Sequence, residues 1–88
     1  MKFDPLIPAP NALLRFATAR TLTGDSAGAF YKKIDAGLMT KPIKIGARQV
    51  ALPFREVDAI NAARIRGASE DEIKALVVQL HADRANAG

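Results

Sequence analysis

The chain has 88 residues, of which 49% are hydrophobic and 25% are charged, and these values are typical of one small globular domain. It has no cysteine, which excludes disulfides and thiolate zinc sites, and no apolar run approaches the roughly 20 residues that a membrane span needs. The net charge of +4 is uneven, because six lysines or arginines and one aspartate lie between Ala27 and Arg55, whereas residues 56–88 hold four basic and six acidic side chains.

The first ten residues contain three prolines and do not have the pattern of a signal peptide, so we expect an extended arm over residues 1–10. Residues 13–22 show a mixed pattern. Leu14 and Phe16 alternate as in a strand, whereas the residues after Phe16 could share a helix face. We expect a short strand here, followed by a helix over about residues 17–22.

A short turn is predicted to separate this helix from the next one. Gly24 can end the first helix with a positive φ, and either Asp25 or Ser26 can cap the free amides of the second. The second helix is expected over about residues 27–36, with Gly37 after its last turn. The two helices form a helix-turn-helix in outline.

The hydrophobic period then changes from 3.6 to 2, which predicts a β-hairpin over residues 43–52 with its tip at residues 46–49. Lys44 lies between Ile43 and Ile45 in the first strand. Because both isoleucines are expected to face inward, Lys44 is expected to face outward.

Two further helices are predicted after the hairpin. The first begins near Pro53 and ends before Gly67, and the second begins with the capping-box pattern from Ser69 to Glu72. The second helix carries an apolar stripe at positions i, i+3, i+4 and i+7, formed by Ile73, Leu76, Val77 and Leu80. This stripe could serve self-association, or it could cover the domain's own core.

Catalytic or metal chemistry is hard to build from these residues, so we expect no enzyme activity, cofactor, metal or small-molecule substrate. A nucleophilic triad or a metal site needs several convergent groups, and His81 is the only imidazole in the chain. We expect His81 at the surface or in an interface. The neighbouring acids Glu70, Asp71 and Glu72 are explained by their position at the positive end of a helix dipole.

Nucleic-acid binding needs parts that the chain does have. The basic middle segment indicates a polyanionic partner, although a solvated lysine-rich face explains its charge equally well. The second helix begins with small residues that permit close approach to DNA, and cations follow on that helix and on the hairpin. The candidate DNA-binding residues are Ser26, Ala27, Gly28, Tyr31, Lys32, Lys33, Lys41, Lys44 and Arg48. Tyr31 could instead be a half-buried core ring, and Lys33 could merely solvate its helix.

Three motifs occur in order along the chain: TGDSAGAFYKKI at residues 23–34, GLMTKPIKIGAR at residues 37–48 and EVDAI at residues 56–60. With these motifs the chain resembles the AlpA family of phage and plasmid regulators. The resemblance covers about residues 15–66, and the helix predicted over residues 69–84 is similar to the tail that many members carry.

Members of this family are winged helix-turn-helix proteins related to excisionases and to the MerR DNA-binding domain. The resemblance implies that the helix from Ser26 reads the major groove and that the hairpin with Arg48 touches the backbone or the minor groove. The chain departs from the family at Ala27 and Gly28, where members often have an arginine and a hydroxyl residue. These two residues favour phosphate contacts and DNA shape over direct base readout.

The expected fold is mainly α with a small β-hairpin: a winged helix-turn-helix over residues 11–67 and an amphipathic C-terminal helix over residues 68–88. The expected function is sequence-selective binding of double-stranded DNA by a cytoplasmic transcriptional regulator of mobile-element genes or a recombination directionality factor. A single module of this kind buries only about 600–1,000 Å² on DNA, so we expect a homodimer or a cooperative oligomer on DNA. The alternative is a protein-interaction adaptor that keeps the winged-helix fold without DNA readout.

Overall fold

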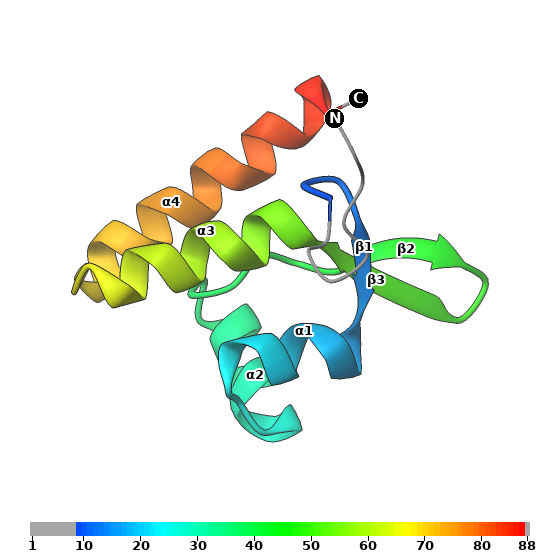
Figure 1. Cartoon of the computed structure of the whole chain (residues 1–88), viewed down its shortest axis with the longest axis horizontal. Coiled ribbons are helices and arrows are strands. Elements are labelled where there is room, and N and C mark those ends of the chain that lie inside the picture. The colour runs from blue at the N-terminus through cyan, green and yellow to red at the C-terminus, as the bar shows by residue number, and fades with distance from the viewer. Residues whose placement is uncertain (1–8, 88) are drawn as a thin grey trace.

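A computed structural model describes residues 9–87, so most of the arm expected over residues 1–10 lies outside the described residues. The elements, in chain order, are β1 (Leu13–Arg15), α1 (Phe16–Thr23), α2 (Ala27–Asp35), β2 (Ile43–Gly46), β3 (Gln49–Pro53), α3 (Phe54–Ile65), α4 (Glu70–Asp83) and the 3₁₀ turn η1 (Arg84–Asn86). The fold is therefore mainly α with a small antiparallel sheet (Figure 1). Within residues 9–87, no helix combines the length and the apolar character needed to cross a bilayer.

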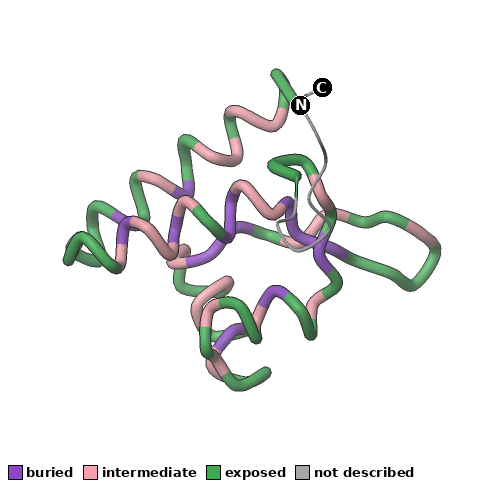
Figure 2. The backbone as a smooth tube through the Cα atoms, viewed as in Figure 1, coloured by how far each residue is buried: buried purple, intermediate pink, exposed green. Residues whose placement is uncertain are grey.

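The sheet has three strands in the order β1-β3-β2, and both pairings are antiparallel. The predicted hairpin is confirmed as β2 and β3, and the predicted short strand is confirmed as β1, which pairs with the other edge of β3. Leu14 lies opposite Leu52, and both are buried in the core. The far end of the hairpin projects away from the helices (Figure 1) and is largely exposed (Figure 2).

The connection between α1 and α2 follows from two local signals. Gly24 has a φ of 76°, and its N–H returns to the last turn of α1, which ends that helix as expected. Of the two cap candidates, Ser26 is the cap of α2, because its side chain accepts a hydrogen bond from the backbone N–H of Ala29 at 3.2 Å. Gly37, with a φ of 78°, follows the end of α2.

The two C-terminal helices also begin and end where expected. Gly67 has a φ of 81° just after α3. Ser69 and Glu72 form a reciprocal capping box, with both hydrogen bonds 3.2 Å long, at the start of α4. Pro53 differs slightly from the prediction, because it is the extended residue before α3 and the last residue of β3 rather than the first helical residue.

One hydrophobic core joins the sheet to all four α-helices, and α4 packs on the side of α3 away from α1 and α2 (Figure 1). The predicted stripe of α4 lies within this core: Ile73 and Val77 are buried, and Leu76 and Leu80 pack against the buried cluster. The stripe therefore covers the domain's own core, as one of the two predictions has it, and its use in self-association stays a prediction.

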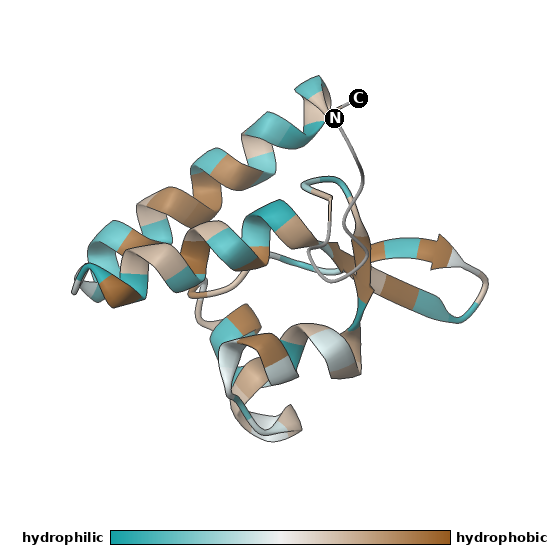
Figure 3. Cartoon of the chain, in the orientation of Figure 1, coloured by the Kyte–Doolittle hydropathy of each residue, from teal (hydrophilic) through white to brown (hydrophobic). Residues whose placement is uncertain are grey.

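The hairpin contradicts one prediction. Ile43 is half-buried, but Ile45 is 40% exposed, as is Val50 on the partner strand. The register shifts at a bulge between Lys44 and Gly46, and this part of the hairpin lies beyond the helices that could cover it. Hydrophobic residues consequently continue along the projecting strands, outside the core (Figure 3).

Candidate nucleic-acid interface

The start of α2 is exposed and carries only small side chains. Ser26, Ala27 and Gly28 are all exposed, and a Cβ added at Gly28 would meet no atom within 4 Å. The Ser26 hydroxyl is already used as the helix cap. This end of α2 can therefore approach a partner closely, but it offers few side-chain hydrogen-bonding groups, as the sequence predicts.

Tyr31 is an exposed ring rather than a core ring. It is 56% exposed, and its ring stacks on Phe16 of α1, with 4.4 Å between ring centroids and 27° between planes. Phe16 in turn packs edge-on against the buried Phe30 at 5.1 Å. The three rings tie α2 to α1 and hold Tyr31 on the outer side of the helix pair.

The two lysines of α2 have different environments. Lys32 is exposed, whereas the Nζ of Lys33 lies 2.6 Å from the Oδ1 of Asp25, with which it forms an ion pair. The Thr23 hydroxyl donates to the other oxygen of Asp25 at 2.7 Å. Burial alone would raise the pKa of the Asp25 carboxyl, but the hydrogen bonds from Lys33 and Thr23 outweigh it and lower the pKa. Lys33 therefore orders the inter-helix turn, which leaves Lys32 as the more available cation.

The hairpin contributes Lys44 and Arg48, and both are exposed. Arg48 lies in the two-residue turn between β2 and β3, as predicted. Lys44 pairs directly with Val50, two residues from Leu52, so these three side chains share one face of the sheet. Because Leu52 on that face is buried in the core, Lys44 lies on the helix-covered side of the sheet and not, as expected, on the opposite side. It is exposed because the hairpin extends beyond the helices (Figure 1).

Lys41 is held at a different place. Its backbone N–H donates to the Nε2 of His81 at 3.0 Å, and its carbonyl accepts from Arg84 at 2.6 Å. Both partners lie at the C-terminal end of α4, on the far side of α3 from α2 (Figure 1). The structure thus brings Lys41 beside α4 rather than beside the exposed residues at the start of α2.

The most buried polar contact was not predicted from the sequence. The carboxylate of Glu56 is fully buried and accepts two hydrogen bonds from Arg84, at 2.7 and 2.8 Å. These residues are 28 positions apart, so no local spacing indicates the pair. His81, predicted at the surface or in an interface, is half-buried, and burial and then the nearby Arg84 cation lower its pKa.

In the part of the chain that the structure describes, no group of three His, Asp or Glu side chains is placed to hold a metal ion. No family model, no curated protein and no solved structure matches the chain. The resemblance to the AlpA family thus stays a prediction from the motifs.

Proposed function

We propose that the chain binds double-stranded DNA as a winged helix-turn-helix, with α2 in the major groove and the β2–β3 hairpin as the wing on the adjacent backbone. The observation that supports this proposal most is the exposure of three cations, Lys32, Lys44 and Arg48, on these two elements. The small residues at the start of α2 add a surface that can approach a groove closely. The resemblance to AlpA regulators supports a role in transcription or recombination of a mobile element.

The proposed contacts are mainly with phosphates and with DNA shape. Ala27 and Gly28 have no side-chain donor or acceptor for a base edge, whereas Tyr31 and the three cations can contact the backbone. Each cation that neutralises a phosphate contributes about 0.9 to the slope of log affinity against log salt. Three such contacts predict a slope of about −2.7. With so few phosphate contacts a single copy should bind DNA weakly, so tight binding needs neighbouring copies on the same duplex.

The test is fluorescence anisotropy with a labelled duplex at several salt concentrations. Lys44→Glu and Arg48→Glu should each weaken binding by about tenfold near 100 mM salt and flatten the salt slope by about 0.9. The matched control is Arg66→Glu, which makes the same charge change at an exposed position just after α3, at the end of that helix away from the hairpin (Figure 1). Binding of all three variants with equal affinity would contradict the assigned surface.

The alternative function is an adaptor that keeps the fold and binds proteins instead of DNA. The absence of base-reading groups at Ala27 and Gly28 favours it, as do the strongly exposed apolar residues Ile65 and Val78 on α3 and α4. An adaptor predicts no salt-dependent duplex binding by the wild type. That result would reject the DNA proposal in favour of the adaptor.

A further inference from the structure

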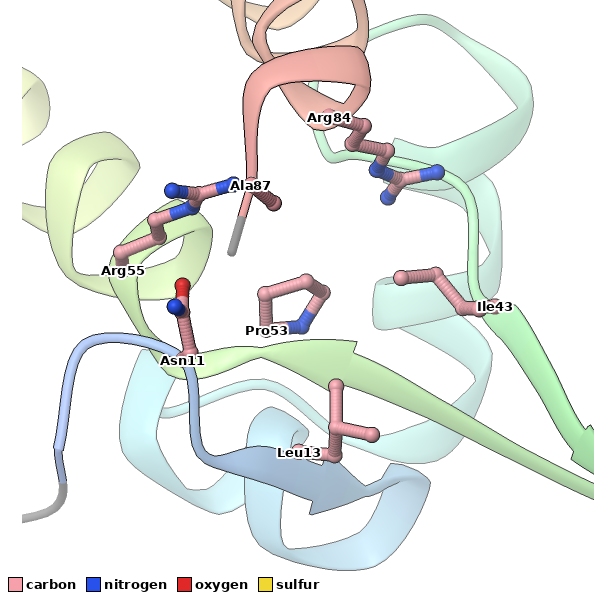
Figure 4. Close-up of a pocket in the computed structure, with 7 residues that line it drawn as sticks. All are labelled: Asn11, Leu13, Ile43, Pro53, Arg55, Arg84 and Ala87. Atoms are coloured by element: carbon pink, nitrogen blue, oxygen red, sulfur yellow. The ribbon is translucent and has the colours of Figure 1, made fainter.

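A cavity lies on the face of the sheet opposite α1. Its volume is about 300 Å³, and Figure 4 shows its lining side chains arranged around an open space. The lining residues are Asn11, Leu13, Ile43, Pro53, Arg55, Arg84 and Ala87. They come from the turn before β1, from all three strands, from the start of α3 and from the C-terminal residues at and after η1, so the cavity depends on segments far apart in the sequence.

The floor of the cavity is apolar for a reason found in the strand register. Leu13 pairs with Pro53, and Ile43 pairs with Ala51, so these side chains share the face that points away from the core residues Leu14 and Leu52. Leu13 remains 51% exposed at the edge of this face. Leu13 and Ile43 thus offer apolar surface that a compact hydrocarbon group can cover, and the buried Pro53 lies on the strand between them.

Among the described residues 9–87, one of the two arginines beside this floor has an acidic partner and the other has none. Arg84 is neutralised by the buried Glu56, which receives two of its hydrogen bonds. The side chain of Arg55 has no ion pair or side-chain hydrogen bond with any residue in the described range 9–87. Arg55 also lies in the first turn of α3, where the helix dipole disfavours a cation. An anion beside Arg55 would relieve this unfavourable charge.

We propose that this cavity binds a small organic carboxylate with a compact apolar body. The body covers Leu13 and Ile43 above the buried Pro53. The carboxylate accepts hydrogen bonds from the guanidinium of Arg55 and the side-chain amide of Asn11, which face the same space (Figure 4). The cavity volume is at the lower end of the range for small-molecule sites, which limits the ligand to a single ring or a short branched chain. This site is separate from the proposed DNA surface and does not depend on it.

The experiment is a titration of the full chain with cyclohexanecarboxylate, followed by the methyl NMR signals of Leu13 and Ile43. Two matched probes separate the parts of the ligand: acetate has the charge without the body, and cyclohexylmethanol has the body without the charge. We expect saturable shifts with a Kd near or below about 1 mM for cyclohexanecarboxylate, and binding at least about tenfold weaker for either probe. No saturation up to about 20 mM, or equal binding of the alcohol, would overturn the proposal.

A second arm tests the residue that supplies the selectivity. Arg55→Gln should weaken cyclohexanecarboxylate binding by about tenfold and leave the weak binding of the alcohol unchanged, since only the charge-assisted contact is removed. The matched control is Arg66→Gln, an exposed arginine just after α3 that does not line the cavity and should bind as the wild type does. Equal affinity of the two variants would show that Arg55 does not hold the anion, and the proposed site would be wrong.

Discussion

Replacing Arg84 with methionine should destabilise the fold by about 3 kcal/mol. The change removes both hydrogen bonds to the Glu56 carboxylate, which is fully buried, and leaves its negative charge in the core without a partner. Breaking a buried ion pair from one side costs about 3–5 kcal/mol. The lower value applies here because the Arg84 side chain is 24% exposed, so that water can reach the carboxylate once the guanidinium is gone. Methionine keeps most of the alkyl packing, so the loss reports the unpaired charge together with the lost hydrogen bond from Arg84 to the Lys41 carbonyl.

The assay is urea unfolding at pH 7, followed by circular dichroism and supported by thermal melts. A loss of about 3 kcal/mol corresponds to a Tm lower by roughly 12–24 °C in a domain of this size. Arg66→Met, at an exposed position, should stay within about 0.5 kcal/mol of the wild type. A loss below about 1 kcal/mol for Arg84→Met would refute the reasoning, because the carboxylate would then not depend on its partner.

The double variant Glu56→Met, Arg84→Met provides a sharper form of the same test. It buries no charge, so it should be more stable than Arg84→Met alone although it lacks both partners. The coupling between the two positions should be about 0.5–3 kcal/mol, as for residues in direct contact. Additive effects of the two substitutions would mean that the pair does not act as a unit.

The remaining predictions concern the histidine, one cap and two glycines. Acidification below pH 6.5 should destabilise the protein, because burial and the neighbouring Arg84 lower the pKa of His81 below its ordinary value of 6.5. The folded state thus favours the neutral ring, which accepts a hydrogen bond from the backbone N–H of Lys41. This stabilisation is complete above pH 6.5 and is lost as the pH falls through the lowered pKa, and urea unfolding across this range should show a smaller dependence in His81→Gln. Ser69→Ala should lower the Tm by about 4–8 °C, since a capping box contributes about 1 kcal/mol, and an unchanged melting curve would contradict that role. Gly24→Ala should destabilise the fold by about 1 kcal/mol, because Gly24 has a φ of 76°. Gly28→Ala should stabilise it by about 0.5–1 kcal/mol, because Gly28 lies in α2 with open space around it. Urea unfolding that gives both changes the same sign would contradict these different backbone roles of the two glycines.

Much of the helical framework could be predicted because its boundaries are set by neighbouring residues. Gly24, Gly37 and Gly67 each follow a helix and adopt a positive φ, and Ser26 and Ser69 each cap the next helix. In each case the signal and the structure that it produces lie within four residues of each other, so a single sequence contains the information.

The contacts between distant elements could not be predicted in the same way. Glu56 occurs in a motif that indicates a helix, but nothing in that motif shows that its carboxylate is buried or that Arg84 neutralises it. The contact of His81 with the Lys41 backbone spans 40 positions. Such contacts depend on how α4 lies across α3, which is set by the whole core rather than by local pattern.

Strand alternation alone was insufficient to predict on which face of the sheet Lys44 lies. Alternation divides a strand into two faces, but it does not say which face meets the core. That choice is made by β1, because the pairing of Leu14 with Leu52 identifies the buried face of β3, and the pairing of Val50 with Lys44 carries this assignment to β2. Lys44 therefore lies on the same side of the sheet as α1, and α2 packs beside α1. A protruding strand can expose a cation on the face that continues from the core. With Lys44 on this face, the hairpin and α2 are better placed for the proposed contact with one duplex than they would be with Lys44 on the opposite face.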